Sequence, residues 1–422
     1  MQSTDFGNPI HVESLVRQIH AKSTRPLTLM EVCGGQTHAI LRYGIDQLLP
    51  PHLRIVHGPG CPVCVTPAET IDRAIEIASA PGVIFCTFGD MLRVPGSQSN
   101  SNANDLMHAK SQGADVRVIQ SPLDALRIAR VESQNTSPGS PNRQVVLFAI
   151  GFETTAPATA MAIRQAKELQ LDSFSALVCH VLVPPALDAI FADVDHGIDG
   201  LLAAGHVCTI AGDHPYHRLA DQFNLPIAIT GFEPVDLLRG ILNLVEQLEA
   251  KPTSYRVDNL YEHIASAEGN LQAQRTVETV FAVCDQHWRG MGSIPQSGLK
   301  LQPQFASFDA SSRFPQRKLP GEQTSCCRAA DVLRGKIRPI ECPAFGTLCD
   351  PNHPLGAPMV SAEGACAAYF LYQALAPLNP IKLNPIKLNP IKLTSSELTS
   401  SELTSSELTQ SESPNPKDNL AP

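Results

Sequence analysis

Short apolar runs alternate with helical patterns along the chain from about residue 27 to residue 250. After each run comes a segment with apolar residues at positions i, i+3 and i+4, which is the spacing of an amphipathic helix. We count eight such βα units, and their alternation predicts parallel sheets covered by helices on both faces. The predicted strands are TLMEV, LRIVHG, VIFCTFG and DVRVIQ, followed by QVVLFAIG, FSALVCHVLV, GHVCTIAG and LPIAITG.

A Ser-, Pro- and Asn-rich stretch at 131–143 divides the eight units into two groups of four. Such a stretch cannot supply a core face, so we interpret it as a linker or a surface insertion. The pattern therefore predicts an α/β fold with a first domain at 1–130 and a second at 144–250, around a cleft. A single eight-stranded barrel is the less favoured alternative, because the number of units alone does not exclude it.

The chain beyond residue 250 has a different character. The alternation fades, and Cys, Pro and Gly punctuate the sequence, so we predict a smaller, Cys-rich accessory domain at 251–376. The pentapeptide LNPIK then occurs three times from Leu378, and LTSSE occurs three times from Leu393. A five-residue period fits neither a helix nor a strand, and polar residues dominate, so 377–422 is predicted to be a disordered tail.

Composition limits the classes of function. The 422 residues are 43% hydrophobic and 17% charged, as in ordinary globular proteins, and the formal net charge is -9. An acidic chain without a basic patch is a poor match for nucleic-acid binding. The start has no signal-like pattern, and the most apolar window, 174–192, contains Pro184, Pro185 and Asp188. We therefore expect no membrane span and a cytoplasmic location.

Twelve cysteines in such a chain call for chemistry other than a disulfide framework. Cys61 and Cys64 form a C-x-x-C pair, whose sulfurs can close a disulfide or chelate one metal ion. Thr66 to Glu69 fits a capping box, which predicts a helix just after the pair whose positive end favours thiolate. Redox use is favoured over metal binding, because zinc ribbons prefer two paired knuckles and this chain has no second C-x-x-C.

Cys33 precedes two glycines at the predicted end of the first strand. Because ligands of open parallel sheets bind at the carboxyl ends of the strands, Cys33 and the C-x-x-C pair are predicted to share one edge of the cleft. A free cysteine is usually a buried small hydrophobe, but a thiolate here could hold iron or another thiophilic metal. His38 should lie in the first turns of the following helix. Asp90 and Glu153 are acids at strand ends, available for hydrogen bonding or proton transfer.

Four further cysteines are spaced for a metal centre: Cys327, Cys342, Cys349 and Cys366. Four thiolates can enclose either a [4Fe-4S] cluster or a tetrahedral zinc ion, and the spacing does not choose between them. Cys326 competes with its neighbour for the first ligand position. The other cysteines, and the histidines near predicted strand ends, are interpreted as structural residues. They are Cys86, Cys179, Cys208 and Cys284, with His57, His180, His206, His214 and His217.

With these residues in view, the chain resembles the HypD family of hydrogenase maturation factors. The resemblance rests on EVCGGQTH at 31–38, HGPGCPVCVTP at 57–67, AIGFETTAPATA at 149–160, TGFEPVDLLRG at 230–240 and the Cys-rich stretch at 332–370. It implies two α/β domains and an accessory domain that holds a [4Fe-4S] cluster. It also implies a scaffold that assembles the Fe(CN)2CO unit of [NiFe]-hydrogenase. The implied partners are the small chaperone HypC and the cyanide-supplying protein HypE, with HypF upstream.

The resemblance also implies roles for single residues. Cys33 would bind the iron together with a cysteine of HypC, and His38 would support that site. Cys61 and Cys64 would form the redox dithiol, and Glu153 is added as a candidate catalytic acid. The cluster ligands would be Cys327, Cys342, Cys349 and Cys366, since Ala329 and Pro358 stand where relatives often carry a further cysteine.

Attaching cyanide to iron is a reductive step, so we hypothesise an electron path from the cluster to the C-x-x-C pair and on to iron at Cys33. One alternative is a stand-alone iron-sulfur thiol-disulfide oxidoreductase, which would leave the CGGQTH motif idle. Another is a zinc-stabilised binding module without redox function, which would be colourless. Infrared bands of iron-bound CN and CO distinguish the scaffold from both.

Overall fold

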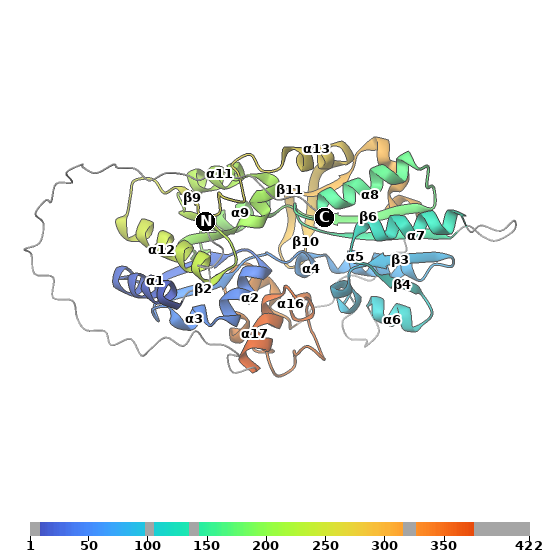
Figure 1. Ribbon diagram of the computed structural model, residues 1–422. Coiled ribbons are helices and arrows are strands. Elements are labelled where there is room, and N and C mark those ends of the chain that lie inside the picture. Colours follow the sequence, from blue (N-terminus) through green and yellow to red (C-terminus); the bar gives the residue numbers. More distant parts are fainter. Residues whose placement is uncertain (1–8, 98–104, 135–142, 315–325, 375–422) are drawn as a thin grey trace, which may run out of the picture. The chain divides into compact units, whose positions relative to one another are not determined.

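The computed structural model describes residues 9–97, 105–134, 143–314 and 326–374, all within one compact unit of the chain. Two parallel sheets and an antiparallel hairpin organise it (Figure 1). The α/β class with parallel sheets and a Cys-rich segment is therefore confirmed. The predicted tail at 377–422 lies outside the described residues.

The first sheet has five parallel strands in the order β2-β1-β7-β8-β9. Strands β7 and β8 are buried along their whole length, which suits their continuous apolar sequences. Strand β1 pairs with β2 in a register that sets Glu31 opposite His57, so the carboxyl ends of these strands meet. The strands are β1 (Leu27–Glu31), β2 (Leu53–His57), β7 (Gly200–Ala204), β8 (Ile227–Thr230) and β9 (Val257–Asn259).

The second sheet has four parallel strands in the order β4-β3-β5-β6. Its central strands β3 and β5 are almost entirely buried, whereas β4 lies at an edge and is only partly covered. The strands are β3 (Val83–Thr87), β4 (Asp115–Val118), β5 (Gln144–Gly151) and β6 (Phe174–His180).

The sheets do not follow the predicted division into 1–130 and 144–250. Each sheet takes two strands from the first stretch and the rest from later in the chain. The chain leaves the first sheet after β2, builds the whole second sheet, and returns at β7. Hydrophobic periodicity reports that a strand is buried, but not which strand lies beside it, so the sequential division was wrong for the sheets.

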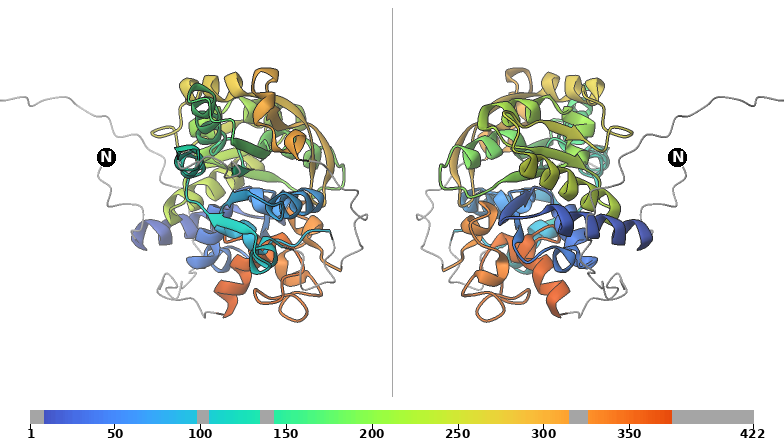
Figure 2. Two further views of the ribbon diagram at one scale, coloured as in Figure 1. Left: turned by 90° about the vertical axis from the view of Figure 1, so that its right-hand side faces the viewer. Right: turned by 90° about the vertical axis from the view of Figure 1, so that its left-hand side faces the viewer.

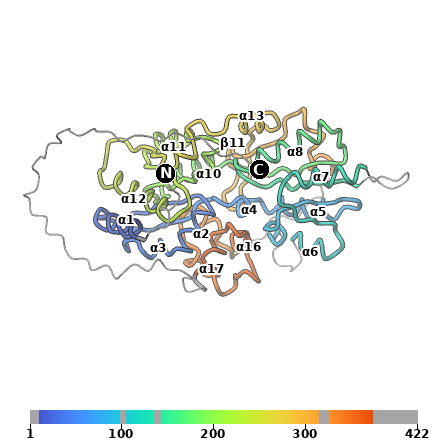
Figure 3. Tube along the Cα trace, viewed as in Figure 1, coloured from blue at the N-terminus to red at the C-terminus, as the bar shows by residue number. Residues whose placement is uncertain are grey.

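Helices cover the sheets and join distant parts of the chain. In α12 the buried Leu238, Ile241 and Val245 follow helical spacing. This helix packs against α1, the first helix of the described chain (Figure 3). The helices up to this point are α1 (Pro9–Lys22), α2 (Gly34–Arg42), α3 (Ile45–Leu48), α4 (Pro62–Val65), α5 (Ala68–Ala78), η1 (Gly89–Arg93), α6 (Leu106–Ser111), α7 (Pro122–Gln134), α8 (Ala156–Glu168), α9 (Val183–Phe191), α10 (Gly205–Ala211), α11 (His214–Phe223) and α12 (Pro234–Ala250).

Two local predictions were wrong. The run GHVCTIAG forms helix α10, because the preceding GLLAA segment already fills the place in the sheet as β7. The predicted linker at 131–143 begins inside helix α7, which continues to Gln134. The part of that linker at 135–142 lies outside the described residues.

The chain after α12 does not form one accessory domain. Strand β9 completes the first sheet, and the hairpin β10–β11 packs against β6 and α9. Only 326–374 makes a compact Cys-rich segment, whose α16 and α17 contact α4 and α2 (Figure 2). The elements are α13 (Leu271–Val280), β10 (Phe281–Trp288), β11 (Gly292–Leu301), η2 (Pro303–Phe308), α14 (Ala310–Arg313), α15 (Ala329–Leu333), η3 (Pro339–Glu341), α16 (Ala357–Val360) and α17 (Ala365–Ala374). Within the described ranges, no helix combines the length and apolar character needed to cross a membrane.

Candidate redox and metal site

Cys33 and the C-x-x-C pair are brought together by the pairing of β1 with β2. Cys33 follows β1 as the N-cap of α2, and Cys61 follows β2 as the N-cap of α4. The two loops touch, since the backbone N–H of Gly34 donates to the carbonyl of Gly60 at 3.2 Å. A Cβ on Gly60 would lie 2.4 Å from the Cys33 nitrogen, so only glycine allows this approach. The two cysteine loops therefore lie side by side at one sheet edge.

The Cys33 sulfur faces the start of α10. It packs in a small apolar cluster with Ala204 and Val207, and Nδ1 of His206 lies 3.9 Å away. The His206 ring in turn packs against Phe232, with ring centroids 5.2 Å apart. A soft sulfur beside an imidazole nitrogen is a donor pair that suits iron.

Burial sets the protonation state of this pair. It raises the pKa of the Cys33 thiol to about 12; backbone N–H groups of α2 oppose this shift and the negative charge of Glu31 adds to it. Burial also lowers the pKa of His206. Both groups are therefore neutral at physiological pH, and a bound metal ion would be needed to hold Cys33 as thiolate.

A buried carboxylate fixes the backbone of the Cys33 loop. Glu31 is 1% exposed and accepts hydrogen bonds from the Cys33 N–H at 2.7 Å and from the Thr37 hydroxyl at 2.5 Å. It also pairs with Nδ1 of His57 at 2.5 Å, and Nε2 of that ring lies 3.0 Å from the Tyr369 hydroxyl. This polar chain joins the Cys33 loop to α17 of the Cys-rich segment.

Cys61 and Cys64 form a disulfide, and the two residues are only 3% and 1% exposed. The Cys64 N–H lies 3.1 Å from the Cys61 sulfur. The predicted capping box does not form, because the CPVC segment is itself a helical turn, α4, and the Thr66 hydroxyl donates back to the carbonyl of Pro62. Helix α5 begins only at Ala68.

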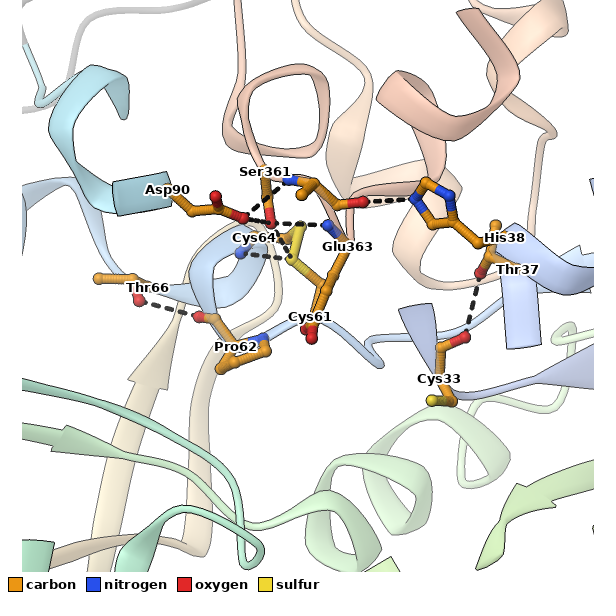
Figure 4. The surroundings of a disulfide bond; sticks show 11 residues. Cys33, Thr37, His38, Cys61, Pro62, Cys64, Thr66, Asp90, Ser361 and Glu363 are labelled. Atoms are coloured by element: carbon orange, nitrogen blue, oxygen red, sulfur yellow. Dashed lines mark hydrogen bonds between the residues drawn. A yellow bond between two sulfur atoms is a disulfide. The ribbon is translucent and has the colours of Figure 1, made fainter. Parts of the chain in front are cut away.

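Residues 361–363, in the loop between α16 and α17, are the meeting point of the site and are called the 361–363 loop below (Figure 4). Ser361 is fully buried, and its Oγ lies 3.4 Å from the Cys61 sulfur. Asp90, in η1 just after β3, accepts hydrogen bonds from the Ser361 hydroxyl at 3.2 Å and the Ala362 N–H at 2.8 Å. His38 of α2 hydrogen-bonds the Ala362 carbonyl. The 361–363 loop therefore contacts the disulfide, η1 after β3 and the helix that Cys33 begins.

The four spaced cysteines converge on one cavity next to this loop. The cavity is lined by Cys327, Cys342, Cys349 and Cys366, with apolar side chains that include Val332, Leu355 and Met359. Cys326 is exposed and does not line it. Cys366 lies in the first turn of α17, five residues after Ser361. One short segment of chain therefore contacts both the disulfide and the cavity.

The donor set of the cavity fits an iron-sulfur cluster, because four cysteines line it. Burial raises the pKa of Cys366, Cys349 and Cys327, and the other thiols of the group add to the shift. A Cβ on Gly356 would lie 2.5 Å from the Cys327 sulfur, so a side chain there would intrude on the cysteine group. Across the described residues, no three Cys, His, Asp or Glu side chains gather closely enough for a single metal ion.

The chain is similar to known proteins over most of its length. A family model described as "HypD: Hydrogenase formation hypA family" matches residues 11–373. A Bradyrhizobium diazoefficiens protein named Hydrogenase maturation factor HypD2 is 45% identical over 367 residues, which cover 85% of this chain and 93% of that protein. Hydrogenase maturation factor HypD of Escherichia coli is 44% identical over 368 residues, covering 86% and 94%. The chain belongs to the HypD family of hydrogenase maturation factors.

Membership of the HypD family does not place every predicted residue at this site. Glu153 lies after β5, where its Oε1 accepts the N–H of Val183 at 2.9 Å. Its Oε2 is shielded from solvent and has no partner within the described residues. Burial raises the pKa of Glu153 to about 7. No hydrogen bond or ion pair in the described part of the chain links it to Cys33 or to the disulfide, so a catalytic role for Glu153 stays a prediction.

Several residues of the site were missed in the sequence. Glu31 and His57 end paired strands, and a parallel register between the first two strands would have set them opposite each other. His206 was interpreted as structural because a histidine near a strand end is more often a hydrogen-bonded structural residue than a ligand. Its segment forms helix α10 instead of the predicted strand. Ser361 gave no local signal, because its contact with Cys61 joins residues 300 positions apart.

Proposed function

We propose that this HypD-family protein is the scaffold on which the Fe(CN)2CO unit of [NiFe]-hydrogenase is assembled, with Cys33 as the protein anchor of the iron. One observation carries the proposal. A free thiol, a disulfide and a four-cysteine cavity all border the 361–363 loop or the loops that touch it. The iron is the cargo of this reaction and leaves with the product.

The surroundings of Cys33 suit low-spin iron. Such iron with cyanide and carbonyl ligands needs an electron-rich thiolate and shelter from water. Cys33 is 6% exposed, and the apolar cluster around it supplies that shelter. His206 stands beside the sulfur as a second donor, and the hydrogen bond that the Cys33 N–H donates to Glu31 holds the Cys33 backbone in place. His38 supports the site by holding the 361–363 loop rather than by reaching the sulfur.

The four-cysteine cavity is the site for a resident [4Fe-4S] cluster, held by Cys327, Cys342, Cys349 and Cys366. A cluster bound there would supply electrons one at a time. The contribution of the chain is to enclose it with apolar side chains. The Cys61–Cys64 pair can take up two electrons as its S–S bond breaks, which suits the reductive attachment of cyanide.

Partners of the maturation pathway complete the proposal. A HypC-type chaperone would contribute a cysteine to the iron at Cys33. A HypE-type protein would donate cyanide, with a HypF-type protein acting before it. The family match supports partners from this pathway.

A stand-alone thiol-disulfide oxidoreductase is less well supported. Reduction of a protein disulfide requires a thiolate that a partner can reach. Cys61 and Cys64 are almost completely buried, and Ser361 covers the Cys61 sulfur. An internal acceptor such as iron at Cys33 fits this burial better than an external disulfide does.

The proposal is tested by complementation of a bacterium that lacks its own HypD-family protein. The wild-type chain should restore [NiFe]-hydrogenase activity, whereas Cys33→Ser, Cys61→Ser and Cys366→Ser should leave it at the level of the empty vector. Cys284→Ser is the matched control, because Cys284 lies on β10 and does not line the four-cysteine cavity. Wild-type activity with Cys33→Ser would refute the anchoring role.

A further inference from the structure

We infer that Asp90, acting through the Ser361 hydroxyl, is a positioning residue that keeps Cys61 protonated after the disulfide is reduced. The inference rests on the proposed redox use of the Cys61–Cys64 pair and assigns a role to two residues outside that pair. Asp90 comes from η1, which follows β3, and Ser361 comes from the 361–363 loop (Figure 4).

The hydrogen bonds of the Ser361 hydroxyl leave one of its lone pairs unused. A serine hydroxyl has one proton to donate and two lone pairs that accept. The proton goes to Oδ2 of Asp90, at 3.2 Å, and one lone pair accepts the Glu363 N–H at 3.1 Å. The Cys61 sulfur lies 3.4 Å from the same oxygen. The remaining lone pair is therefore available to a proton on Cys61.

This acceptor has a purpose only in the reduced state. A disulfide sulfur carries no proton, so Cys61 cannot donate to Ser361 while the S–S bond is intact. On reduction the S–S bond breaks, the pair takes up two electrons, and each sulfur takes up one proton. The Cys61 S–H can then donate to Ser361, whose own proton stays on Asp90.

The charges around Cys61 favour the thiol over the thiolate. A thiolate would face an oxygen lone pair backed by the Asp90 carboxylate, and like charges raise the pKa of a thiol. Burial raises the pKa of the Glu363 carboxyl and the charge of Asp90 adds to this shift, so Glu363 contributes mainly through its backbone N–H to Ser361. Within the same helical turn, the Cys64 N–H lies 3.1 Å from the Cys61 sulfur, and this donor favours the thiolate instead. Asp90 is the charge that is bonded to Ser361 directly.

The experiment follows the pH at which Cys61 becomes reactive in the full-length holoprotein under anaerobic conditions. A water-soluble phosphine reduces the disulfide, since phosphine and water give phosphine oxide and two thiols. A short pulse of iodoacetamide at a series of pH values is then read by mass spectrometry of the Cys61 peptide. Asp90→Asn keeps acceptors for Ser361 and Ala362 but removes the charge. In Asp90→Asn we expect the alkylation midpoint, the pH at which Cys61 reacts at half its maximal rate, to fall by about one unit. This corresponds to about tenfold more Cys61 thiolate at a given pH below the midpoint.

Two further variants make the result specific. Asp124→Asn removes a carboxylate that caps α7, and it should leave the midpoint unchanged. In a Ser361→Ala background, Asp90→Asn should shift the midpoint much less, because the hydroxyl that links the two groups is gone. Equal midpoints in wild type and Asp90→Asn, or an undiminished shift in the Ser361→Ala background, would overturn the inference. A disulfide that stays intact both with the phosphine and when dithionite reduces the iron-sulfur cluster of the holoprotein would instead overturn the proposed redox use itself, and the inference with it.

Discussion

Glu31 shows how a single side chain ties the two halves of the site together. Its carboxylate receives the Cys33 N–H and pairs with His57, whose other ring nitrogen meets Tyr369. Tyr369 lies on α17, as Cys366 does. The four groups of this hydrogen-bonded chain, Glu31, Cys33, His57 and Tyr369, are nearly inaccessible to water. A buried network of this kind is stable only when every member has its partner. The backbone of Cys33 is therefore held in a position that depends on the docking of the Cys-rich segment.

Glu153 gives a prediction about pH. Its pKa is raised to about 7 by burial, whereas the unfolded chain has the ordinary value of about 4.3. Between these values the folded protein keeps a proton that the unfolded chain has lost, so stability falls as pH rises through this window and levels off above about 7. Glu153→Gln should remove this fall. The free energy of unfolding of the variant, relative to that of wild type, should therefore be about 2 kcal/mol higher at pH 8 than at pH 5.

Urea unfolding at the two pH values measures this difference. Glu168→Gln, at the exposed end of α8, is the control and should follow wild type. Burial also lowers the pKa of His180 to about 4, which makes the folded protein less stable as pH falls. This contribution is the same in every variant, so it cancels when their pH dependences are compared. Identical pH dependence in Glu153→Gln and wild type would contradict the assignment.

At the scale of elements, the 361–363 loop is the piece that joins three parts of the site. It lies between α16, whose Met359 lines the four-cysteine cavity, and α17, which carries Cys366. Helix α2 packs directly on it, because a Cβ on Gly34 would lie 2.6 Å from Cβ and the carbonyl oxygen of Glu363. Gly34 thus permits the close approach of the helix that Cys33 begins.

Gly34→Ala should push the 361–363 loop away from α2. Backbone atoms cannot yield as a flexible side chain does, so we expect a loss of about 1–3 kcal/mol in stability. Amide hydrogen exchange should quicken in the peptides that cover 361–374. Gly89→Ala is the control, since its Cβ would meet only Val118 Cγ1 at 3.8 Å. Unchanged exchange in 361–374 for Gly34→Ala would show that this contact does not hold the loop.

Elements were predictable from the sequence to the extent that their signals are local. Apolar runs located seven of the eight predicted strands, and the strand-end rule placed Cys33 beside the C-x-x-C loop. The run GHVCTIAG failed because an apolar segment flanked by glycines fits a strand and a short helix equally well. The meeting of Ser361 with Cys61 has no local signal, since it arises from the docking of segments far apart in the chain.

At the scale of the molecule, the chain returns to its first sheet after building the second. This return sets β7 against β1 and brings His206 of α10 to the sulfur of Cys33. The Cys-rich segment then closes over the ends of β1, β2 and β3. The site is therefore assembled from the beginning, middle and end of the described chain, so no fragment of it should retain the site.

The central claim is that Cys33 anchors iron while the other sulfur groups serve it from nearby. It is tested most directly by infrared spectroscopy of the anaerobic protein purified together with a HypC-type chaperone. Wild type should show bands of iron-bound CN and CO, and Cys33→Ser should lose them while keeping the brown colour of an iron-sulfur cluster. CN and CO bands of wild-type intensity in Cys33→Ser would contradict the account.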